Sequence, residues 1–360
     1  MKILAINPGS TSTKIAVYED STPRLVYSIR HSVEELAEFA HIIDQLEFRK
    51  HLVLESLQKH GIPFEFDAII GRGGLLKPIP GGVYEVNDAM LDDCVHAMRS
   101  HACNLGCLIA YQLAASLPGC RSFIADPGVV DELDEIARIT GSPIMPRVVI
   151  WHALNQRAIA RRYAAELTAR HPEHPIHYED LNLIVCHLGG GVSVGVHRHG
   201  RAVDVPNALD GSGPFSPERA GTLPAGQLID LCHSGQYTMS ELKKRISGKA
   251  GLVAHLGTTD IPVIEQRIAD GDTHAELVLN AMIYQIAKEI GGAAVVLWGK
   301  IDAILLTGGM AHSNYITSRL CARISFLAPV HIYPGEDELE ALALNALGAL
   351  RGELPIHEYR

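Results

Sequence analysis

The residues from Gly9 to Lys14 place several hydrogen-bond donors and one positive charge in a single short loop. Gly9 has no side chain, so backbone or ligand can approach closely, and the next four residues are all serine or threonine. Lys14 adds a positive charge at the same place. Such a set of donors binds phosphate oxygens, so the loop predicts an anion site. An ordinary polar hairpin turn is the alternative.

Two arginines occupy positions where ligands are commonly bound. Arg72 stands in the sequence GRGG at the end of a predicted buried strand, where open α/β sheets place ligands. Arg219 stands in DGSGPFSPERAG, residues 210–221, whose glycines and prolines predict an irregular, shaped loop. Two guanidinium groups could clamp a transferring phosphoryl group or a carboxylate. Surface ion pairs are the alternative for each arginine.

Acidic and imidazole side chains flank other predicted elements. Asp126 follows a predicted strand over 122–125 and precedes a Pro-Gly turn, which suits either a Mg²⁺ ligand or a turn aspartate. His152 precedes a helix that begins near Ala153, and it could donate to a phosphoryl oxygen or cap the helix. His187 immediately precedes a glycine triplet and could face a phosphate.

A run of acids in YPGEDELEAL has two interpretations. Glu336, Asp337 and Glu338 could cap the helix that follows, or one of them could lend a Mg²⁺ ligand. Capping is the plainer interpretation, because acids are common at helix starts.

The elements that position these residues occur twice along the chain. Apolar runs predict strands on both sides of the loop at Gly9, and LIVCHLGGGVSVGVHRHGRAV, residues 183–203, repeats this as strand, glycine turn, strand, hairpin and strand. DAIIGRGG from Asp67 and DAILLTGG from Asp302 form a second matching pair. Each of these follows a predicted helical segment, over 33–60 and 275–292. The repetition predicts two related α/β domains that face each other and hold a polyphosphate between them.

Composition limits the partners of the chain. A length of 360 residues with 47% hydrophobic content is enough for two domains with real cores. The formal charge of −10 argues against nucleic acid or an anionic membrane as the main partner. Seven scattered cysteines without a CxxC pair, and a start unlike a signal peptide, predict reduced thiols and a cytoplasmic protein. Nineteen histidines form no metal-ligand spacing.

These motifs together resemble the butyrate kinases, within the acetate kinase family of the acetate kinase, sugar kinase and actin superfamily. The resemblance covers nearly the whole chain, through INPGSTSTK, CHLGGG with VSVGVHRHGRAVD, and LLTGGMAHS. HALNQ, DGSGPFSPERAG and YPGEDELEAL are similar to butyrate kinases rather than acetate kinases. The resemblance implies two duplicated actin-like, ribonuclease H-like α/β domains with a nucleotide cleft between them. We expect one domain over 1–148 plus 341–360 and the other over 149–340.

The resemblance also assigns roles to residues. Arg72 and Arg219 resemble the arginines that bind the carboxylate and stabilise the transition state, with His152 as a transition-state donor and Asp126 as a catalytic, metal-side carboxylate. The expected contacts to the phosphoryl group and Mg²⁺ come from Asn7, Ser10, Ser12 and Lys14, with Asn7, Asp126, Glu336 and Glu338 as candidate metal ligands. The expected nucleotide contacts come from His187, Gly189, Gly190, Gly191, Asp260, Gly308, Gly309 and Met310. Acetate kinases carry an asparagine at the position of Gly190, so one phosphate contact differs here.

The implied reaction converts ATP and a short fatty acid into ADP and an acyl phosphate, reversibly, by in-line transfer. Gly74 stands near a bulky aliphatic residue of acetate kinases, which favours a deeper acyl pocket with Leu75 and Trp151 as walls, and so butyrate or a branched relative. A kinase for acetate or propionate is the alternative, and a sugar kinase with Asp126 as base is a further one. An ATP-binding sensor of the actin type would be a non-enzymatic alternative. The resemblance implies at least a dimer.

Overall fold

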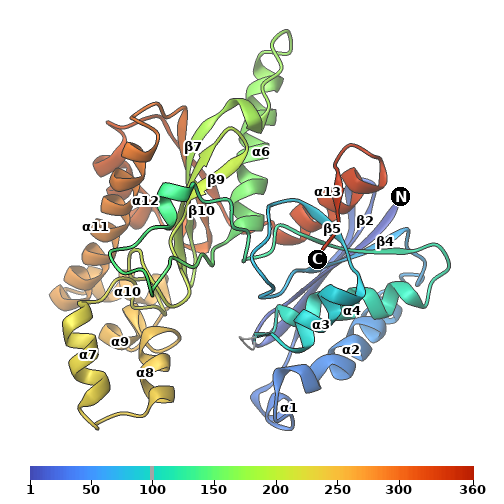
Figure 1. The fold of residues 1–360 in the computed structure, drawn as a ribbon, viewed down its shortest axis with the longest axis horizontal. Coiled ribbons are helices and arrows are strands. Elements are labelled where there is room, and N and C mark those ends of the chain that lie inside the picture. The colour runs from blue at the N-terminus through green and yellow to red at the C-terminus, as the bar shows by residue number, and fades with distance from the viewer. Residues whose placement is uncertain (98–100) are drawn as a thin grey trace. The chain divides into compact units, whose positions relative to one another are not determined.

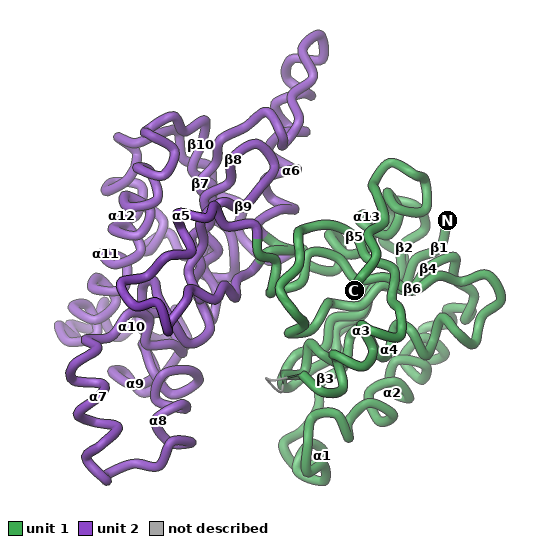
Figure 2. The backbone as a smooth tube through the Cα atoms, viewed as in Figure 1, with its two compact units in different colours: residues 1–131, 153–155, 337–360 green, residues 132–152, 156–336 purple. Residues whose placement is uncertain are grey.

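Two sheets organise the chain, one in each of two compact units (Figures 1 and 2). The computed structural model describes residues 1–97 and 101–360. Unit 1 contains 1–131, 153–155 and 337–360, and unit 2 contains 132–152 and 156–336. Unit 1 is therefore assembled from both ends of the chain. The predicted domain boundaries at 148 and 340 stay a prediction.

Unit 1 carries a seven-stranded sheet in the order β12-β5-β6-β4-β1-β2-β3. Its strands are β1 (Lys2–Pro8), β2 (Ser12–Glu19), β3 (Thr22–Arg30), β4 (Ala68–Arg72), β5 (Val83–Glu85), β6 (Arg121–Ala125) and β12 (Ile356–His357). Its helices are α1 (Val33–Ala37), η1 (Ile42–Gln45), α2 (Leu46–Lys59), α3 (Asp88–Val95), α4 (Asn104–Ala115) and α13 (Glu338–Leu350).

Unit 2 carries a five-stranded sheet in the order β11-β10-β7-β8-β9. Its strands are β7 (Asn182–Leu188), β8 (Val192–Arg198), β9 (Arg201–Asp204), β10 (Ala303–Gly308) and β11 (Val330–Pro334). Its helices are α5 (Glu135–Arg138), α6 (Ala153–Arg170), η2 (Tyr178–Asp180), α7 (Ala225–His233), α8 (Met239–Ile246), α9 (Gly251–Leu256), α10 (Ile261–Ala269), α11 (Thr273–Val296), η3 (Gly309–His312) and α12 (Asn314–Ile324). The first three residues of α6 group with unit 1.

The same strand pattern occurs in both units. In unit 1, β1, β2 and β3 form an antiparallel meander, and β4 and then β6 add in parallel on the other side of β1. In unit 2, β7, β8 and β9 form the meander, and β10 and β11 add in parallel beside β7. The predicted duplication of an α/β unit is confirmed by these matching orders.

Helices cover the sheets because the central parallel strands are largely apolar and buried. β10 is buried at every position, as expected for a parallel strand covered on both faces. In unit 1, Leu4 and Ile6 of β1 share a core cluster with Leu105 of α4, and α13 also contacts β1 and β4 (Figure 1). In unit 2, α11 contributes a row of buried residues to the core.

One predicted element differs in the structure. The expected helical segment over 33–60 is divided into α1, η1 and α2. The cause is local: Ser32 and Glu35 form a capping box that starts α1. The backbone N–H of His41 then donates to the Asp44 carboxylate, which starts a new turn.

Candidate active site

Three of the predicted site residues lie at the carboxyl ends of adjacent parallel strands in unit 1. Asn7 is near the end of β1, Arg72 ends β4, and Asp126 follows β6. The register pairs Ile6 with Gly71 and Arg72 with Ala125, so the three positions are neighbours along one edge of the sheet. Ligand sites of open α/β sheets lie at this edge.

One buried carboxylate joins two of these residues. The Asn7 side-chain amide donates to Oε2 of Glu338 over 2.6 Å, and Nη1 of Arg72 donates to the same oxygen over 2.9 Å. Glu338 is the first residue of α13, which brings it from the far end of the sequence to β1. Of the three acids in the 336–338 run, Glu338 is the one that meets the predicted phosphoryl-site residues.

The acidic run does not cap α13 by a side-chain hydrogen bond, although Glu338 lies in the first turn of that helix. Asp337 is the residue at the N-cap of α13, but its side chain makes no capping hydrogen bond. Glu336 belongs to unit 2, where its carboxylate lies 3.2 Å from Nε2 of His187. The acids are therefore distributed between two units rather than used together at one helix start.

The loop between β1 and β2, which is predicted to bind phosphate, is held by a buried arginine that the sequence analysis did not identify. Arg49 of α2 is only 1% exposed, and its guanidinium donates to the backbone oxygens of Gly9 at 2.8 Å, Ser12 at 3.1 Å and Ser10 at 3.3 Å. Burial lowers the pKa of Arg49 to about 10. Because the N–H and C=O of one peptide point in opposite directions, this tether turns the N–H groups that follow Gly9 and Ser10 away from Arg49. They are free to face an anion, as the loop sequence predicts.

Lys14 and Asn7 are direct partners across the hairpin. The register of β1 and β2 pairs them, so their side chains project from the same face of the sheet. Lys14 is exposed and Asn7 is buried. Ser10 lies in the turn between the two strands and Ser12 begins β2, and the Gly9 N–H donates to the Ser12 oxygen over 2.7 Å. Their contacts to a phosphoryl group stay a prediction.

Asp126 lies at the predicted site and is also hydrogen-bonded to the backbone of Gly82. It is 1% exposed and has φ of 39°, a left-handed conformation that is uncommon outside glycine. Its carboxylate accepts the Gly82 N–H over 2.8 Å, and its own N–H donates to the Gly82 oxygen. The turn that Asp126 makes is therefore fixed to the segment before β5. Its catalytic and metal roles stay predictions.

The second loop is packed against the irregular segment over 210–221. Gly190 offers its backbone oxygen to the Ser216 hydroxyl at 2.7 Å and to the Glu218 N–H at 3.3 Å. A side chain at Gly191 would lie 2.3 Å from Nη1 of Arg219, so the guanidinium rests directly on this glycine. Nη1 of Arg219 also donates to the Ala208 oxygen. The predicted irregular loop is confirmed, and it brings Arg219 to the glycine triplet.

His152 and His187 form a stacked pair in unit 2. Their ring centroids are 3.8 Å apart with planes only 10° from parallel. His187 is buried, and Nδ1 of His152 lies 2.8 Å from the Ser193 hydroxyl on β8. His152 is at the N-cap position of α6, yet its side chain makes no capping bond, so the capping alternative is wrong.

The predicted acyl-pocket residues lie in two different units, Gly74 and Leu75 in unit 1 and Trp151 in unit 2. A side chain at Gly74 would lie 2.7 Å from Oδ1 of Asn104, the first residue of α4, and that oxygen accepts the Leu75 N–H over 2.8 Å. The space that a larger residue at Gly74 would need is therefore filled by Asn104. Trp151 is buried in unit 2, and its ring forms a T-shaped pair with the ring of His197. The role of Gly74, Leu75 and Trp151 in substrate binding stays a prediction.

The remaining nucleotide residues are placed as follows. Gly308 ends β10, and Gly309 and Met310 begin η3, so they follow the strand next to β7. Asp260 caps α10, where its carboxylate accepts the Val263 N–H, and it is exposed. Asp260 therefore has a structural role as the cap of α10. Its contact with the nucleotide stays a prediction.

The oxygen donors of unit 1 fit a magnesium ion that is bound mainly through nucleotide phosphates. Among the described residues, no group of three or more His, Cys, Asp or Glu side chains could hold a metal by itself. Mg²⁺ commonly uses one or two protein carboxylates and keeps phosphate and water ligands. Glu338 with the amide oxygen of Asn7 matches that need.

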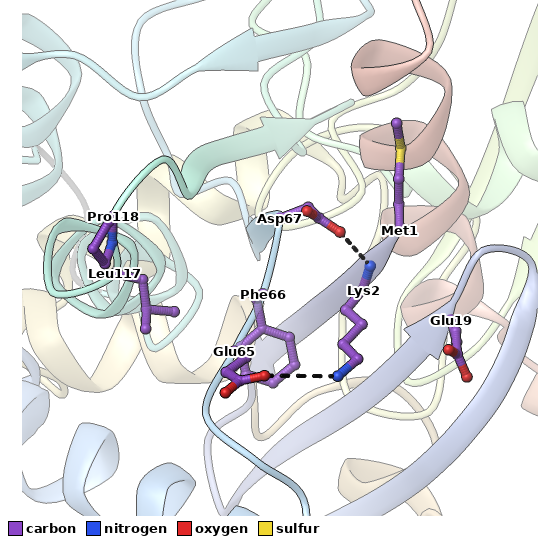
Figure 3. A pocket seen from close by; sticks show the side chains of 8 residues that line it. All are labelled: Met1, Lys2, Glu19, Glu65, Phe66, Asp67, Leu117 and Pro118. Carbon is purple, nitrogen blue, oxygen red and sulfur yellow. Dashed lines mark hydrogen bonds and ion pairs between the residues drawn. The ribbon is translucent and has the colours of Figure 1, made fainter.

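An open pocket elsewhere in unit 1 is unrelated to these residues (Figure 3). It is lined by Lys2, which begins β1, and by Glu65 and Asp67, which precede β4. The Lys2 N–H donates to the Asp67 carboxylate over 2.7 Å. The pocket therefore lies at the amino ends of the strands whose carboxyl ends carry Asn7 and Arg72.

Across residues 1–97 and 101–360, no helix has the length and apolar content to cross a membrane.

Comparison with known proteins gives matches of three kinds. Residues 158–333 match the model of the acetokinase family. A protein of Bacteroides thetaiotaomicron named probable butyrate kinase is 69% identical over the full length of both chains. Another of that name from Phocaeicola vulgatus is 53% identical over all of this chain and 99% of its own. The crystal structure of Porphyromonas gingivalis acetate kinase superposes with a TM-score of 0.78, at 20% identity, over 97% of this chain and 99% of that one. The last match shows the fold, and it confirms the predicted actin-like α/β class.

Proposed function

Because this chain belongs to the acetokinase family, we propose that it transfers the terminal phosphoryl group of ATP to a short-chain fatty acid, butyrate or a branched relative. The products are an acyl phosphate and ADP, and the reaction is reversible. The observation that carries the proposal is the 69% identity, over the full length, to a protein named probable butyrate kinase. The positions of Asn7 near the end of β1, of Arg72 at the end of β4 and of Gly189 directly after β7 support it.

The chemistry makes few demands on proton transfer. A fatty acid has a pKa of about 4 to 5, so its carboxylate is already ionised at neutral pH and needs no general base. The protein must instead bring two anions together and neutralise the charge that spreads over the phosphoryl oxygens. Positive and hydrogen-bonding groups therefore matter more than a base.

Unit 1 supplies groups for the acid and for the phosphoryl group. Arg72 offers a planar guanidinium to the carboxylate, and Lys14 offers a point charge to phosphate oxygens. Glu338 and Asn7 would hold Mg²⁺ with the nucleotide, and Asp126 is a further candidate ligand. The bound ion would supply charge neutralisation on the phosphates.

Unit 2 supplies groups for the nucleotide and the transition state. The turn over Gly189, Gly190 and Gly191 and the neighbouring His187 are the proposed phosphate contacts. Gly308, Gly309, Met310 and Asp260 are the proposed adenosine contacts. Arg219 and His152 are the proposed donors to the transferring group.

The test is acid-dependent ADP formation, with the acyl phosphate trapped as a hydroxamate. Acids from acetate to hexanoate, straight and branched, would be compared with a panel of sugars at saturating MgATP. We expect butyrate or a branched acid to give the highest kcat/KM, with neighbouring acids retained because each buried methylene contributes only about 0.8 kcal/mol. ATP binding without any acid-dependent turnover would contradict the kinase proposal, and equal kcat/KM for acetate and butyrate would contradict only the substrate length.

The setting of the enzyme is part of the proposal. All seven cysteines are free thiols, which supports action in the reducing cytoplasm. We propose a homo-oligomer of at least two chains, which light scattering of the purified protein would test. A monomeric mass at micromolar concentration would overturn that part.

A further inference from the structure

A chain of buried polar side chains leads from His152 into the interior of unit 2. It runs through Ser193 on β8, Gln156 on α6, His197 on β8 and Tyr178 on η2. All but His152 are at most 2% exposed. The contacts are short: Ser193 Oγ to His152 Nδ1 is 2.8 Å, and Gln156 Nε2 lies 2.8 Å from Ser193 Oγ. His197 Nε2 lies 3.0 Å from Gln156 Oε1, and Tyr178 Oη lies 2.6 Å from His197 Nδ1.

The orientation of the Gln156 amide is fixed by a group that can only accept. Its nitrogen lies 3.0 Å from the backbone oxygen of Ser193, and a carbonyl oxygen cannot donate. The amide nitrogen must therefore face Ser193, and Oε1 must face His197. Gly195 makes room for this contact, because a side chain there would lie 2.3 Å from Gln156 Oε1.

The protons on His197 follow from that orientation. Gln156 Oε1 only accepts, so Nε2 of His197 carries the proton that it donates. Burial, together with the nearby Arg157 and Arg161 charges, lowers the pKa of His197 to about 3, so the ring is neutral. Its Nδ1 then has a lone pair and accepts the Tyr178 hydroxyl.

The same assignment of donors and acceptors extends through Ser193 to His152. The Ser193 oxygen accepts from the Gln156 amide at 2.8 Å and from the His152 backbone N–H at 3.5 Å, which uses both of its lone pairs. Its single proton remains to be donated, and His152 Nδ1 is the acceptor in contact with it. The imidazole nitrogen that meets Ser193 must therefore be the unprotonated one.

We propose that Ser193 and Gln156 are positioning residues that hold His152 neutral, with its proton on Nε2. The ring plane is set separately by the stack on His187. This proposal rests on the proposed function for its consequence: an Nε2–H held in this way is a ready donor to a phosphoryl oxygen. A partner that fixes the tautomer of a working histidine is a common device in enzyme sites.

The test reads the tautomer directly. Proton–nitrogen correlation spectra of the whole protein, labelled with heavy nitrogen at histidine, distinguish a protonated Nε2 from a protonated Nδ1. The His152 signals would be assigned by their absence in His152→Gln. The spectra would be recorded for the wild type and for Ser193→Ala, with Ser193→Thr as the variant that keeps the hydroxyl. Ser122→Ala is the matched control, because Ser122 is a buried serine on a strand of unit 1.

We expect the wild type and Ser122→Ala to carry the His152 proton on Nε2 near neutral pH, and Ser193→Ala to show a mixture of tautomers. Ser193→Ala should lower kcat by about tenfold with little change in KM for ATP, and Ser193→Thr should restore both readouts if it folds. A proton on Nδ1 in the wild type overturns the inference, as does an unchanged tautomer in Ser193→Ala. If the tautomer changes as expected while kcat does not, the inference stands and the donor role of His152 in the proposed function fails.

Discussion

At the scale of single residues, Arg72 and Glu338 show how one contact serves two requirements. The guanidinium pairs with a carboxylate whose side chain is only 8% exposed, and the same guanidinium is the proposed ligand for the substrate. A buried carboxylate needs hydrogen bonds or a cation, and Asn7 and Arg72 provide both. Arg72 therefore has a structural role beside the binding role proposed for it.

Replacement of Arg72 separates these two contributions. Arg72→Ala should lower kcat for acyl phosphate formation by about 100-fold or more, because a charge that stabilises the transition state is lost. It should also lower the free energy of unfolding by about 1 to 3 kcal/mol, because the Glu338 carboxylate loses this cation. Adding Glu338→Gln should restore the stability and not the turnover. Near-normal kcat in Arg72→Ala would contradict the assignment, and kinetics with urea unfolding measure both quantities.

His197 makes stability depend on pH. Its pKa is about 3 in the folded protein and near 6.5 when unfolded, so between these values the unfolded chain binds more protons. Its stabilising contribution is therefore complete above about pH 6.5 and declines as the pH falls, by up to about 1.4 kcal/mol per pH unit.

Comparison with His197→Asn isolates this contribution. Urea unfolding of both proteins between pH 6.5 and 4 should show a steeper loss of stability in the wild type. The two plots of unfolding free energy against pH should differ in slope by the equivalent of about one proton, the one that His197 binds on unfolding. Parallel curves would show that His197 is not the neutral buried group that the structure places between Gln156 and Tyr178.

At the scale of elements, the turn between β7 and β8 and the segment over 210–221 act as one structure. Ser216 and the Glu218 backbone bind the Gly190 oxygen, and Arg219 lies on Gly191. The glycines are therefore needed for close packing of a second loop as well as for any approach of a phosphate.

Gly191→Ala tests that packing. The added carbon must displace the Arg219 guanidinium, so kcat should fall by about 10- to 100-fold while the fold is retained. Gly291→Ala is the control, because no atom lies within 4 Å of the added carbon on α11. That control should keep full activity and gain up to about 1 kcal/mol of stability. Wild-type turnover in Gly191→Ala would contradict the position given to Arg219.

At the scale of the whole molecule, the last segment of the chain completes the first unit. Residues 337–360 supply α13, which packs on β1 and β4, and α13 also carries Glu338 to Asn7. The core of unit 1 and the contact of Glu338 with Asn7 therefore need both ends of the chain.

Hydrogen exchange of two core variants measures this organisation. Leu342 of α13 is fully buried, so Leu342→Ala should cost about 2 to 5 kcal/mol. Exchange should become faster in β1 and β4, which precede it by hundreds of residues, while β7 and β10 keep their protection. Leu306→Ala in β10 should give the reverse pattern. Equal loss of protection in both units after either change would show that they unfold as one.

The sequence by itself determined the strands, the two loops and their duplication, because apolar runs, glycine turns and small polar residues are local patterns. It also located Arg72, Asp126 and Arg219 at strand ends or in an irregular loop for the same reason. The kinase family followed from these motifs taken together.

Only the tertiary structure decided which side chains meet. Glu338 was chosen over Glu336 as the partner of Asn7 by the packing of α13, across a separation of 331 residues. Arg49 and Gln156 had no local signal, since their partners are backbone atoms and side chains supplied by other elements. The contact of Gly74 with Asn104, on α4, likewise depends on packing between elements. Contacts between residues distant in sequence depend on how whole elements pack, and a local pattern does not encode that packing.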